Sequence, residues 1–548
     1  MFLHTLFQYI LYKVTCNIAY AVGSGTLRCS IGGVNQTAFT EGFNTRTSVA
    51  SSFTSLSFLR DSTNVDVIIS NVTAKEVTSA DMDVTRTTAA TRVDEDGLVN
   101  YAEIVSDTEL ITNGDFSNGT TDWTVSSGTI SVDNGRLKID SVSGTTAEQT
   151  VTAIIGKTYK VTYDFTLGTA TSGAVIITGG NYPTLNAPEG TNIFYSVATS
   201  TSFRVRPRLG SDGTMFVDNI SVKEATIDNL PRVDYTDGTS SLLVEPQRTN
   251  LITYSEDFTS WNKLAAVVTT NQTTSPSGTL TADKITYDGT TYGRVEQTVA
   301  VTNGNTYSWS VYLKNNDLSD VTQVWLGFSL GGQGEFVTIT NEWQRYETVQ
   351  VANGSNEYPR VQFTGTGSLY AWGAQMEEGS YPTSYIKTSG STVTRNQETY
   401  TKTGISDKIN SEEGVLFAEM AALSNDGTIR YLSINDGTSN NRVTFLYYSS
   451  NTNIRVIVSS GGTNVMDKNS GVSSTLDFHK VAIKWKENDF AFWLDGVKVQ
   501  TDTSGLAPIG LNTLSFDVAG SGNFFGKVKQ LQVFKTALSD SELVTLTT

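Results

Sequence analysis

Residues 148–159, EQTVTAIIGKTY, recur without a gap as residues 296–307, EQTVAVTNGNTY. An upstream stretch recurs too, since residues 110–116, LITNGDF, match residues 251–258, LITYSEDF. A repeat of this length indicates that the chain holds copies of one domain.

A partial copy of the same unit stands at the N-terminus. Residues 12–15, YKVT, match residues 159–162, and residues 70–76 match residues 218–224. This copy lacks a counterpart of the stretch from 108 to about 150. Either a longer ancestor was truncated, or a neighbouring chain supplies the missing strands, because a bare sheet edge is a liability. The apolar N-terminal stretch is interpreted as a strand of this copy rather than as a signal peptide.

The pattern within the repeats is typical of β-strands. Apolar and polar residues alternate in Tyr159–Phe165, Tyr307–Leu313 and Phe336–Thr340, which places one face of each strand in a core. Tight-turn signals such as Asp237-Gly238 and Asp495-Gly496 separate the strands. Regular strands with such turns, and no long helical pattern, predict β-sandwiches or jelly rolls.

We therefore predict an all-β protein of tandem β-sandwich (jelly-roll) domains with one short C-terminal helix, where Ser539 and Glu542 form a capping box. Both connectors contain Arg-Val-Asp followed by a glycine turn, so they are predicted to be ordered. The predicted division is a partial sandwich at 1–80, a connector at 81–107, a jelly roll at 108–226, a connector at 227–246, a jelly roll at 247–390 and a C-terminal sandwich at 391–548.

The composition excludes several classes of function. A net charge of −17 argues against a nucleic-acid-binding protein, because phosphates need excess lysine or arginine. No apolar run is long enough for a membrane-spanning helix, so no membrane insertion is expected. His4 and His479 are the only imidazoles, which makes a multi-histidine metal site untenable. Cys16 and Cys29 supply no disulfide framework for the rest of the chain.

Three segments resemble bacteriophage virion proteins. Residues 83–99, DVTRTTAATRVDEDGLV, look like a connector of phage tail and fibre proteins. Residues 231–251, PRVDYTDGTSSLLVEPQRTNL, which continue to Trp261, are the strongest match. Residues 372–385, WGAQMEEGSYPTSY, are similar to the closing strand of the same phage modules. This resemblance implies a tail fibre or another virion appendage.

The repeats themselves resemble carbohydrate-binding jelly rolls of the xylan- and glucan-binding type. The resemblance rests on Asn113-Gly-Asp-Phe116 with Trp123, and on the closing residues 217–222, VDNISV. That family often holds a structural calcium ion with acidic residues from its first and last strands. By this resemblance Asp115 and Asp218 are candidate Ca²⁺ ligands, although Ca²⁺ needs six to eight oxygen ligands.

The C-terminal region resembles a concanavalin A-like or laminin-G-like sandwich. Residues 414–421, GVLFAEMA, match an early core strand. Residues 479–485, HKVAIKW, and 490–499, FAFWLDGVKV, look like the central hairpin of this family. Residues 525–534, FGKVKQLQVF, look like its last strand.

No catalytic constellation is evident, so we predict that the protein is not an enzyme. Glycoside hydrolysis needs a pair of carboxylates, and glucanases of the concanavalin A-like type carry several on one strand. Here Glu419 is alone on its strand, with Glu412 and Glu413 in the loop before it. His479 begins an alternating strand, where a structural role is expected, and His4 is interpreted in the same way.

Binding of sugars depends on flat aromatic rings with polar groups beside them. Trp309 and Trp343 lie in strand patterns and are expected in the core. Trp325 is less constrained and is a candidate sugar platform, as are Tyr447 and Tyr448 before a loop rich in Asn and Ser.

These observations favour a phage virion protein that presents lectin-like sandwiches to a host-surface polysaccharide. Several weak sites on one rod, or on a homo-oligomer, with a trimer favoured, would bind a polymer by avidity. The expected partners are that polysaccharide and other virion proteins, and the expected location is the virion surface. The alternatives are a purely structural virion component, such as a head decoration or tail-associated protein, a polysaccharide-degrading enzyme and a secreted bacterial adhesin.

Overall fold

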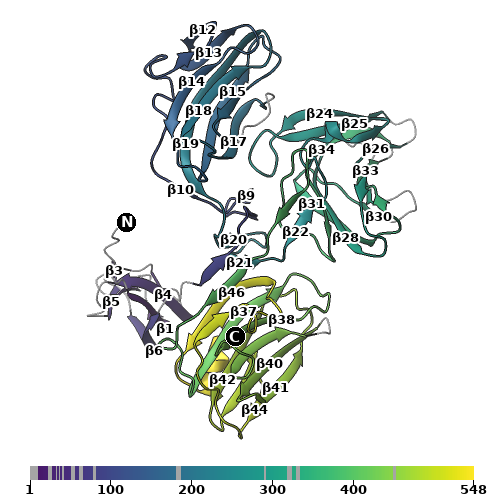
Figure 1. Cartoon of the computed structure of the whole chain (residues 1–548). Helices are drawn as coiled ribbons and strands as arrows, with labels where there is room; N and C mark the ends of the chain where they lie inside the picture. Colours follow the sequence, from purple (N-terminus) through teal and green to yellow (C-terminus); the bar gives the residue numbers. More distant parts are fainter. Residues whose placement is uncertain are drawn as a thin grey trace. The chain divides into compact units, whose positions relative to one another are not determined.

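A computed structural model shows the arrangement of the strands (Figure 1). It describes residues 10–22, 27–31, 34–35, 38–39, 42–50, 56–60, 66–77, 82–180, 187–288, 292–317, 324–328, 334–363, 365–448 and 452–548. These residues form β-strands and a single α-helix, which confirms the predicted all-β class. No helix within these ranges has the length and apolar character needed to cross a membrane. The chain divides into two compact units, Met1–Asp83 and Val84–Thr548.

The first unit contains two small sheets, with strand orders β4-β1-β6 and β3-β2-β5. Their strands are β1 (Ile10–Val22), β2 (Leu27–Ile31), β3 (Val34–Asn35), β4 (Gly42–Ala50), β5 (Leu56–Arg60) and β6 (Asp66–Val77). Strand β1 confirms the interpretation of the N-terminal stretch as a strand from residue 10 onward. Both cysteines, Cys16 and Cys29, are buried in this unit. His4 lies outside the described residues.

The second unit begins with the connector strands β7 (Asp83–Thr85), β8 (Thr91–Val93), β9 (Val99–Tyr101) and β10 (Ile104–Val105). The second module, residues 108–226, follows with two sheets of order β12-β13-β19-β15-β17 and β11-β14-β18-β16. Its strands are β11 (Thr124–Val125), β12 (Thr129–Asp133), β13 (Arg136–Ser141), β14 (Ala147–Thr152), β15 (Thr158–Leu167), β16 (Gly173–Thr178), β17 (Gly190–Val197), β18 (Ser202–Leu209) and β19 (Gly213–Thr226).

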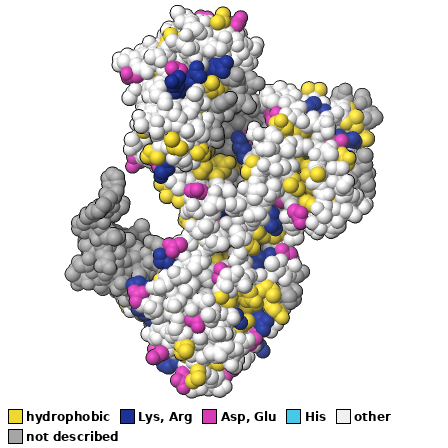
Figure 2. All heavy atoms as spheres, viewed as in Figure 1, with side chains coloured by type: hydrophobic (Ala, Val, Ile, Leu, Met, Phe, Trp, Pro, Cys, Tyr) yellow, Lys and Arg dark blue, Asp and Glu magenta, His cyan; other side chains and the backbone are white. Residues whose placement is uncertain are grey.

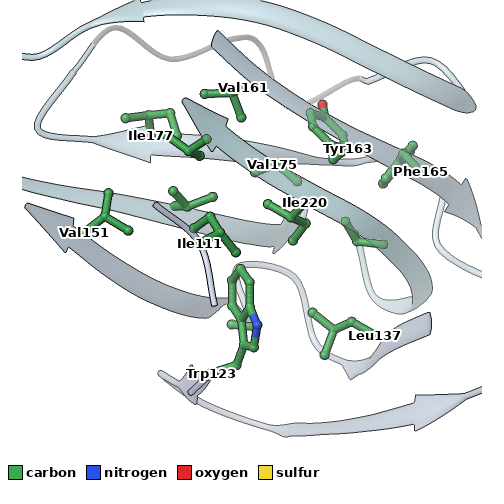
Figure 3. Close-up of a cluster of buried hydrophobic side chains, with 14 of the residues drawn as sticks. Ile111, Trp123, Leu137, Val151, Val161, Tyr163, Phe165, Val175, Ile177 and Ile220 are labelled. Atoms are coloured by element: carbon green, nitrogen blue, oxygen red, sulfur yellow. The ribbon is translucent and has the colours of Figure 1, made fainter. Parts of the chain in front are cut away.

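The core of the second module lies between these two sheets. Strand β15 alternates as its sequence predicts, and Tyr159, Val161, Tyr163 and Phe165 are at most 2% exposed. Figure 3 shows Val161, Tyr163 and Phe165 within the buried cluster. Each large side chain buried in this way contributes roughly 1.5–3 kcal/mol through removal of apolar surface from water.

The strand register of the first unit follows that of this module. In the first unit Tyr12 is paired with Glu76, and in the second module Tyr159 is paired with Glu224. Both strand pairs also shift register at the matching place, after Thr15 and after Thr162. A β-bulge is a specific feature of a strand pair rather than a defect, so its recurrence supports a shared architecture of the first unit and the second module.

The third module, residues 247–390, has two sheets of order β24-β25-β34-β28-β31 and β23-β26-β33-β29-β30. Before it and within it lie β20 (Arg232–Asp234), β21 (Ser241–Val244), β22 (Arg248–Asn250), the 3₁₀ turn η1 (Phe258–Ser260), β23 (Asn262–Leu264), β24 (Ala266–Thr273), β25 (Ala282–Asp288), β26 (Gly293–Glu296), β27 (Val299–Ala300), β28 (Thr306–Asp317), β29 (Val324–Gly327), β30 (Gly334–Val337), β31 (Gln344–Val351), β32 (Asn356–Glu357), β33 (Arg360–Phe363) and β34 (Thr366–Glu378). Trp309 is fully buried in its core, as predicted. Trp343 is half-buried against a small separate cluster instead.

The repeated motif makes the same contacts in both modules. Tyr159 Oη accepts a hydrogen bond from the Ile154 amide at 2.9 Å, and Tyr307 Oη accepts one from the Thr302 amide at 2.9 Å. The buried tyrosine therefore closes the turn that precedes its own strand in each copy.

The C-terminal sandwich has two seven-stranded sheets, β20-β21-β46-β37-β42-β43-β44 and β41-β40-β39-β38-β45-β36-β7. Its own strands are β36 (Thr399–Lys402), β37 (Glu413–Ala422), β38 (Arg430–Asn435), β39 (Arg442–Tyr447), β40 (Asn453–Ser460), β41 (Thr463–Gly471), β42 (His479–Lys486), β43 (Phe490–Leu494), β44 (Val497–Asp502), β45 (Thr513–Ser515) and β46 (Gly526–Phe534), followed by α1 (Asp540–Thr547). The short strand β35 (Val393–Arg395) precedes them and pairs with β22. The capping box of Ser539 and Glu542 is present at α1, as predicted. The connector 227–246 contributes β20 and β21 to one of these sheets, so it is part of the sandwich as well as a link.

Candidate functional site

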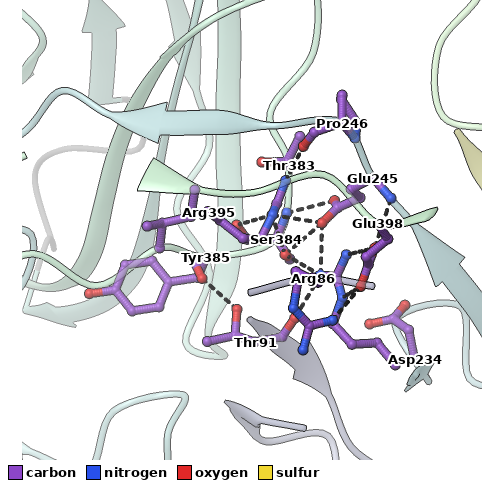
Figure 4. Close-up of polar contacts among 12 residues, drawn as sticks. Arg86, Thr91, Asp234, Glu245, Pro246, Thr383, Ser384, Tyr385, Arg395 and Glu398 are labelled. Atoms are coloured by element: carbon purple, nitrogen blue, oxygen red, sulfur yellow. Dashed lines mark hydrogen bonds and ion pairs between the residues drawn. The ribbon is translucent and has the colours of Figure 1, made fainter. Parts of the chain in front are cut away.

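Five charged side chains meet in the second unit at a buried cluster, here called the charge junction (Figure 4). The junction consists of Arg86, Arg232, Glu245, Arg395 and Glu398. The first comes from the connector 81–107, the next two from the connector 227–246, and the last two follow the third module. Each side chain is at most 4% exposed.

Ion pairs and hydrogen bonds within the junction give each charged group a partner of opposite sign. Glu398 accepts from Arg86 Nη1 at 2.6 Å and from Arg232 Nε at 2.6 Å. Glu245 lies 2.8 Å from Arg232 Nη1 and 2.7 Å from Arg395 Nη1. Burial of charge is unfavourable unless each group is paired and hydrogen-bonded, and these contacts meet that condition. The junction therefore ties both connectors to the chain on either side of the third module.

The arginines of the junction also determine the protonation state of Glu245. Burial acts to raise the pKa of Glu245, but Arg395 and Arg232 outweigh it and lower that pKa to about 2. Glu245 is thus a carboxylate at neutral pH, held as a structural ion.

A different kind of surface lies on the third module, on the sheet β23-β26-β33-β29-β30. The strand register places Leu264, Arg294, Gln362, Trp325 and Phe336 side by side in one row across all of its strands. Because directly paired residues point to the same face of a sheet, this row forms one continuous surface. Phe336 is 65% exposed and Trp325 is half-buried, so the row faces solvent, and we call it the aromatic face.

The opposite side of the same strands forms the core. Val295, Leu326 and Val361 are paired across the sheet and are fully buried. The alternation of strand residues thus fixes which side chains reach the aromatic face. Of the residues on this face, the sequence indicates Trp325 alone, because the neighbours of a tryptophan across a sheet depend on the strand register.

Polar groups surround the rings of the aromatic face. Glu296 Oε2 lies 3.0 Å from Arg294 Nε and 3.0 Å from Arg360 Nη2. Arg360 Cζ lies 5.8 Å from the Trp325 ring centroid. The indole also covers Gly334, where an added Cβ would meet the ring at 2.3 Å. A ring fixed in this way, with guanidinium groups beside it, has the features that recognition of a sugar ring requires.

The two tyrosines predicted as sugar platforms differ from each other. Tyr447 is 3% exposed and stacks on Phe524 with ring centroids 6.0 Å apart. A ring buried in this way cannot stack on a sugar from solution, so the prediction for Tyr447 is wrong. Tyr448 is half-buried, and Arg455 Cζ lies 4.5 Å from its ring centroid. Tyr448 remains a predicted contact.

The structure places Asp115 in the turn before β11 and Asp218 within β19. Two hydrogen bonds from Ser117 lower the pKa of Asp115. Burial raises the pKa of Asp218, and the negative charges of Asp164 and Asp115 act in the same direction. Among the described residues, no group of three or more acidic, histidine or cysteine side chains is arranged to hold a metal ion. These two carboxylates alone do not fit Ca²⁺, which stays a prediction.

The residues considered for catalysis have structural partners. His479 is 7% exposed, with Nδ1 2.6 Å from Asp495 Oδ2 and Nε2 2.9 Å from the Ser474 carbonyl. Glu419 accepts a hydrogen bond from Gln530 at 3.0 Å.

A pocket of about 490 Å³ opens beside β22 on the third module. Its polar lining is already engaged, since Tyr307 and Asn305 donate to Glu378, at 3.3 and 2.9 Å. Arg248 lies over Tyr381 with Cζ 5.5 Å from the ring centroid. The aromatic face therefore offers the more accessible combination of rings and polar groups.

Comparison with known proteins gave no matching family model and no matching curated protein. Among solved structures, the CBM40 of a Ruminococcus gnavus IT-sialidase, bound to α2,3-sialyllactose, is 16% identical over 25% of this chain and 84% of that chain, with a TM-score of 0.23. The N-terminal CBM22-1–CBM22-2 tandem of Paenibacillus barcinonensis Xyn10C is 10% identical over 50% of this chain and 98% of that chain, with a TM-score of 0.19.

A Trypanosoma rangeli sialidase in complex with the inhibitor DANA is 9% identical over 84% of this chain and 98% of that chain, with a TM-score of 0.22. With TM-scores this low, the similarities do not extend to a site or a ligand.

Proposed function

We propose that this protein is a non-enzymatic glycan-binding protein of a phage virion, a tail fibre or appendage that attaches to polysaccharide on the host surface. The observation that carries the glycan-binding part is the aromatic face, where Trp325 and Phe336 stand in one solvent-facing row with Arg294 and Gln362. Flat apolar rings stack on a sugar face, while the polar neighbours fix its orientation.

Affinity at one such face is expected to be modest, because an open sheet surface buries less of a ligand than an enclosed pocket does. Several modules on one chain, or on a trimer, raise the overall affinity for a polymer through effective concentration.

The non-enzymatic part of the proposal is supported by the hydrogen-bond partners of His479 and Glu419, the residues considered for catalysis. Both ring nitrogens of His479 are hydrogen-bonded within the C-terminal sandwich, and Glu419 is bonded to Gln530. A glycosidase needs two carboxylates flanking the scissile bond. Purified protein incubated with host polysaccharide is expected to release no reducing ends. Cleavage that disappears in Glu419→Gln would overturn this part.

The glycan-binding part is tested with Trp325→Ala and Phe336→Ala in the full chain. Each is expected to weaken binding to host cells and to extracted surface glycan by about tenfold or more, the loss typical of a central binding residue. Val267→Ala is the matched control, because Val267 is 65% exposed on the other sheet of the same module. Binding that is unchanged in both aromatic variants, or reduced equally by the control, would refute this assignment.

A purely structural virion role, as a head decoration or tail-associated protein, is favoured by a different observation. The charge junction links both connectors to the chain around the third module through fully buried ion pairs, as a load-carrying scaffold needs. Labelled protein in intact particles separates the two functions. Label at fibre tips favours attachment, and label along a shell or tube favours the structural role.

A further inference from the structure

The sheet of the second module that matches the aromatic face carries arginines instead of rings. Strand β18 presents Arg204, Arg206 and Arg208 at alternate positions, while Phe203, Val205 and Leu209 on its other side are fully buried. Three of the four arginines between residues 108 and 226 thus lie on one face of one strand. Figure 2 shows Lys and Arg side chains (dark blue) gathered in a row on this module.

The partners of these arginines across the sheet are mostly small and uncharged. Arg204 stands between Thr150 and Thr178, and Arg206 is paired with Ile176. Glu148 is the one carboxylate that the register of the described strands places on this face, with Oε2 3.2 Å from Arg206 Nε. One carboxylate among three guanidinium groups leaves the face cationic, although the whole chain carries a net charge of −17.

The repeat shows that this face and the aromatic face are counterparts. Glu148 and Glu296 are the first residues of the two repeated motifs, and each lies beside arginines on the solvent side of its sheet. In the third module Arg360 is 2% exposed and lies under Trp325. In the second module the counterpart of Arg360 is Arg206, which is 27% exposed, and Arg204 on the same strand is 47% exposed. Neither has a ring above it among the described ring contacts. Equivalent surfaces therefore differ in the ligand chemistry they suit.

We infer that the arginine face of the second module, centred on Arg204, Arg206 and Arg208, binds an acidic polysaccharide through its carboxylate groups. This inference rests on the proposed glycan-binding function and assigns a second ligand class to it. Guanidinium groups bind carboxylates through two parallel hydrogen bonds, and alternate strand residues present them at intervals of roughly 6.4–6.8 Å along a line. A polymer with repeated carboxylates suits a row of this kind, because several contacts form at once.

The ion pair between Arg206 and Glu148 fixes the position of Arg206 within the arginine face. Arg206 is held by Glu148 and donates to Thr178 Oγ1 at 3.2 Å, so its orientation is fixed before a ligand arrives. Arg204 lies 4.0 Å from the same carboxylate and is the more accessible group. A net charge of −17 acts against any polyanion, and most against double-stranded DNA, which carries about one charge per 1.7 Å of its axis. A polysaccharide with more widely spaced carboxylates is therefore the favoured ligand.

The test uses the full chain in native gels that contain polygalacturonate, DNA, the neutral polymer dextran or no polymer. Wild-type protein is expected to be retarded by polygalacturonate, less so as salt is added, because exposed charges are screened. Arg204→Gln combined with Arg208→Gln is expected to weaken this retention at least tenfold while it spares the ion pair between Arg206 and Glu148. Arg136→Gln is the matched control, since Arg136 lies over Phe216 on the other sheet of the module.

Retention of the wild type and the control, with loss in the double variant, supports the inference. It is overturned when the wild type is not retained, when the double variant is retained equally, when the control loses retention to the same extent, or when DNA retards the protein as strongly. Thermal unfolding verifies that each variant is folded. The protein could fail to bind polygalacturonate and still bind host glycan through Trp325. That result overturns the inference on the arginine face and leaves the proposed function standing, because the aromatic face lies on another module.

Discussion

Arg232 and Glu398 form a doubly hydrogen-bonded ion pair with both side chains fully buried, although 166 residues separate them in the sequence. Arg86 bonds to the same carboxylate, so one glutamate joins two connectors. A buried pair of this kind is not in itself a source of stability, because desolvation offsets most of the attraction. It is nevertheless sensitive to change, since loss of either partner leaves a buried charge without its counterpart.

Glu398→Ala is therefore expected to destabilise the second unit by about 3–5 kcal/mol, the range found when one partner of a buried pair is removed. The measurement is the urea midpoint from tryptophan fluorescence, together with calorimetry to follow the number of transitions. Asp467→Ala is the control, because Asp467 forms a partly exposed pair with Arg455. Such surface pairs contribute about 0–1 kcal/mol. Equal shifts in the two variants would contradict the structural role of the junction.

The junction also predicts sensitivity to acid through Glu245. Its folded pKa of about 2 lies below its usual value of 4.5, so its contribution to stability is complete above pH 4.5 and is lost as pH falls toward 2. Glu245→Gln removes this titration and leaves the arginines poorly paired. The variant is expected to melt well below the wild type at neutral pH. The gap between their melting temperatures should narrow as pH is lowered from 4.5 to 2, and a constant gap would count against the prediction.

Much of the fold follows from the sequence because its signals are local. Alternation along Tyr159–Phe165 and the capping box at Ser539 each lie within a few residues, and the repeat fixes which segments are equivalent. Those features depend on the period of a strand or the end of a helix, and neither requires a partner from a distant segment.

The parts that sequence analysis missed depend on register or on long-range pairing. Tyr447 and Tyr448 are neighbours, and adjacent strand residues point to opposite faces, so at most one of them was able to reach solvent. Only the pairing of β39 with its neighbouring strands shows which of the two tyrosine rings reaches solvent. The charge junction joins residues up to 312 positions apart, and no short sequence motif predicts such a cluster.

The buried carboxyl group of Asp283 is expected to make the stability of the third module depend on pH with the opposite sign to that of Glu245. Burial raises its pKa to about 7, even though the amides of Phe258 and Asn271 donate to it. The folded state therefore holds a proton that the unfolded state releases near pH 3.8, so stability falls as pH rises from about 4 to 7. The slope is at most one proton, about 1.4 kcal/mol for each pH unit.

Asp283→Asn does not titrate, so its melting temperature relative to the wild type is expected to rise across this interval. Asp467→Asn is the control, because Asp467 lies in the C-terminal sandwich and its charge is not among those that shift the pKa of Asp283. The hydrogen bond and charge of Arg455 outweigh burial and lower the pKa of Asp467 below 3.8. The control should show the same difference from the wild type at pH 4 and pH 7. A flat profile for Asp283→Asn would disprove the assignment.

Substitutions of Tyr447 test whether this side chain belongs to the core of the C-terminal sandwich. Its hydroxyl is buried without a hydrogen-bond partner among the described residues, while its ring packs on Phe524. Tyr447→Phe removes an unsatisfied polar group and keeps the ring, so it is expected to be neutral or stabilising by up to about 1 kcal/mol. Tyr447→Ala should lose about 3–5 kcal/mol by leaving a cavity.

The neighbouring Tyr448→Ala should change stability by no more than about 0.5 kcal/mol, as expected of a surface position. Glycan binding should be unaffected by Tyr447→Phe, because the ring is inaccessible, whereas Tyr448→Ala should weaken it if the half-buried ring contacts a sugar. Denaturation curves and host-cell binding, measured on the same preparations, separate these effects. Reduced binding in a stable Tyr447→Phe protein would mean that the hydroxyl reaches a ligand after all, in conflict with its burial against Phe524.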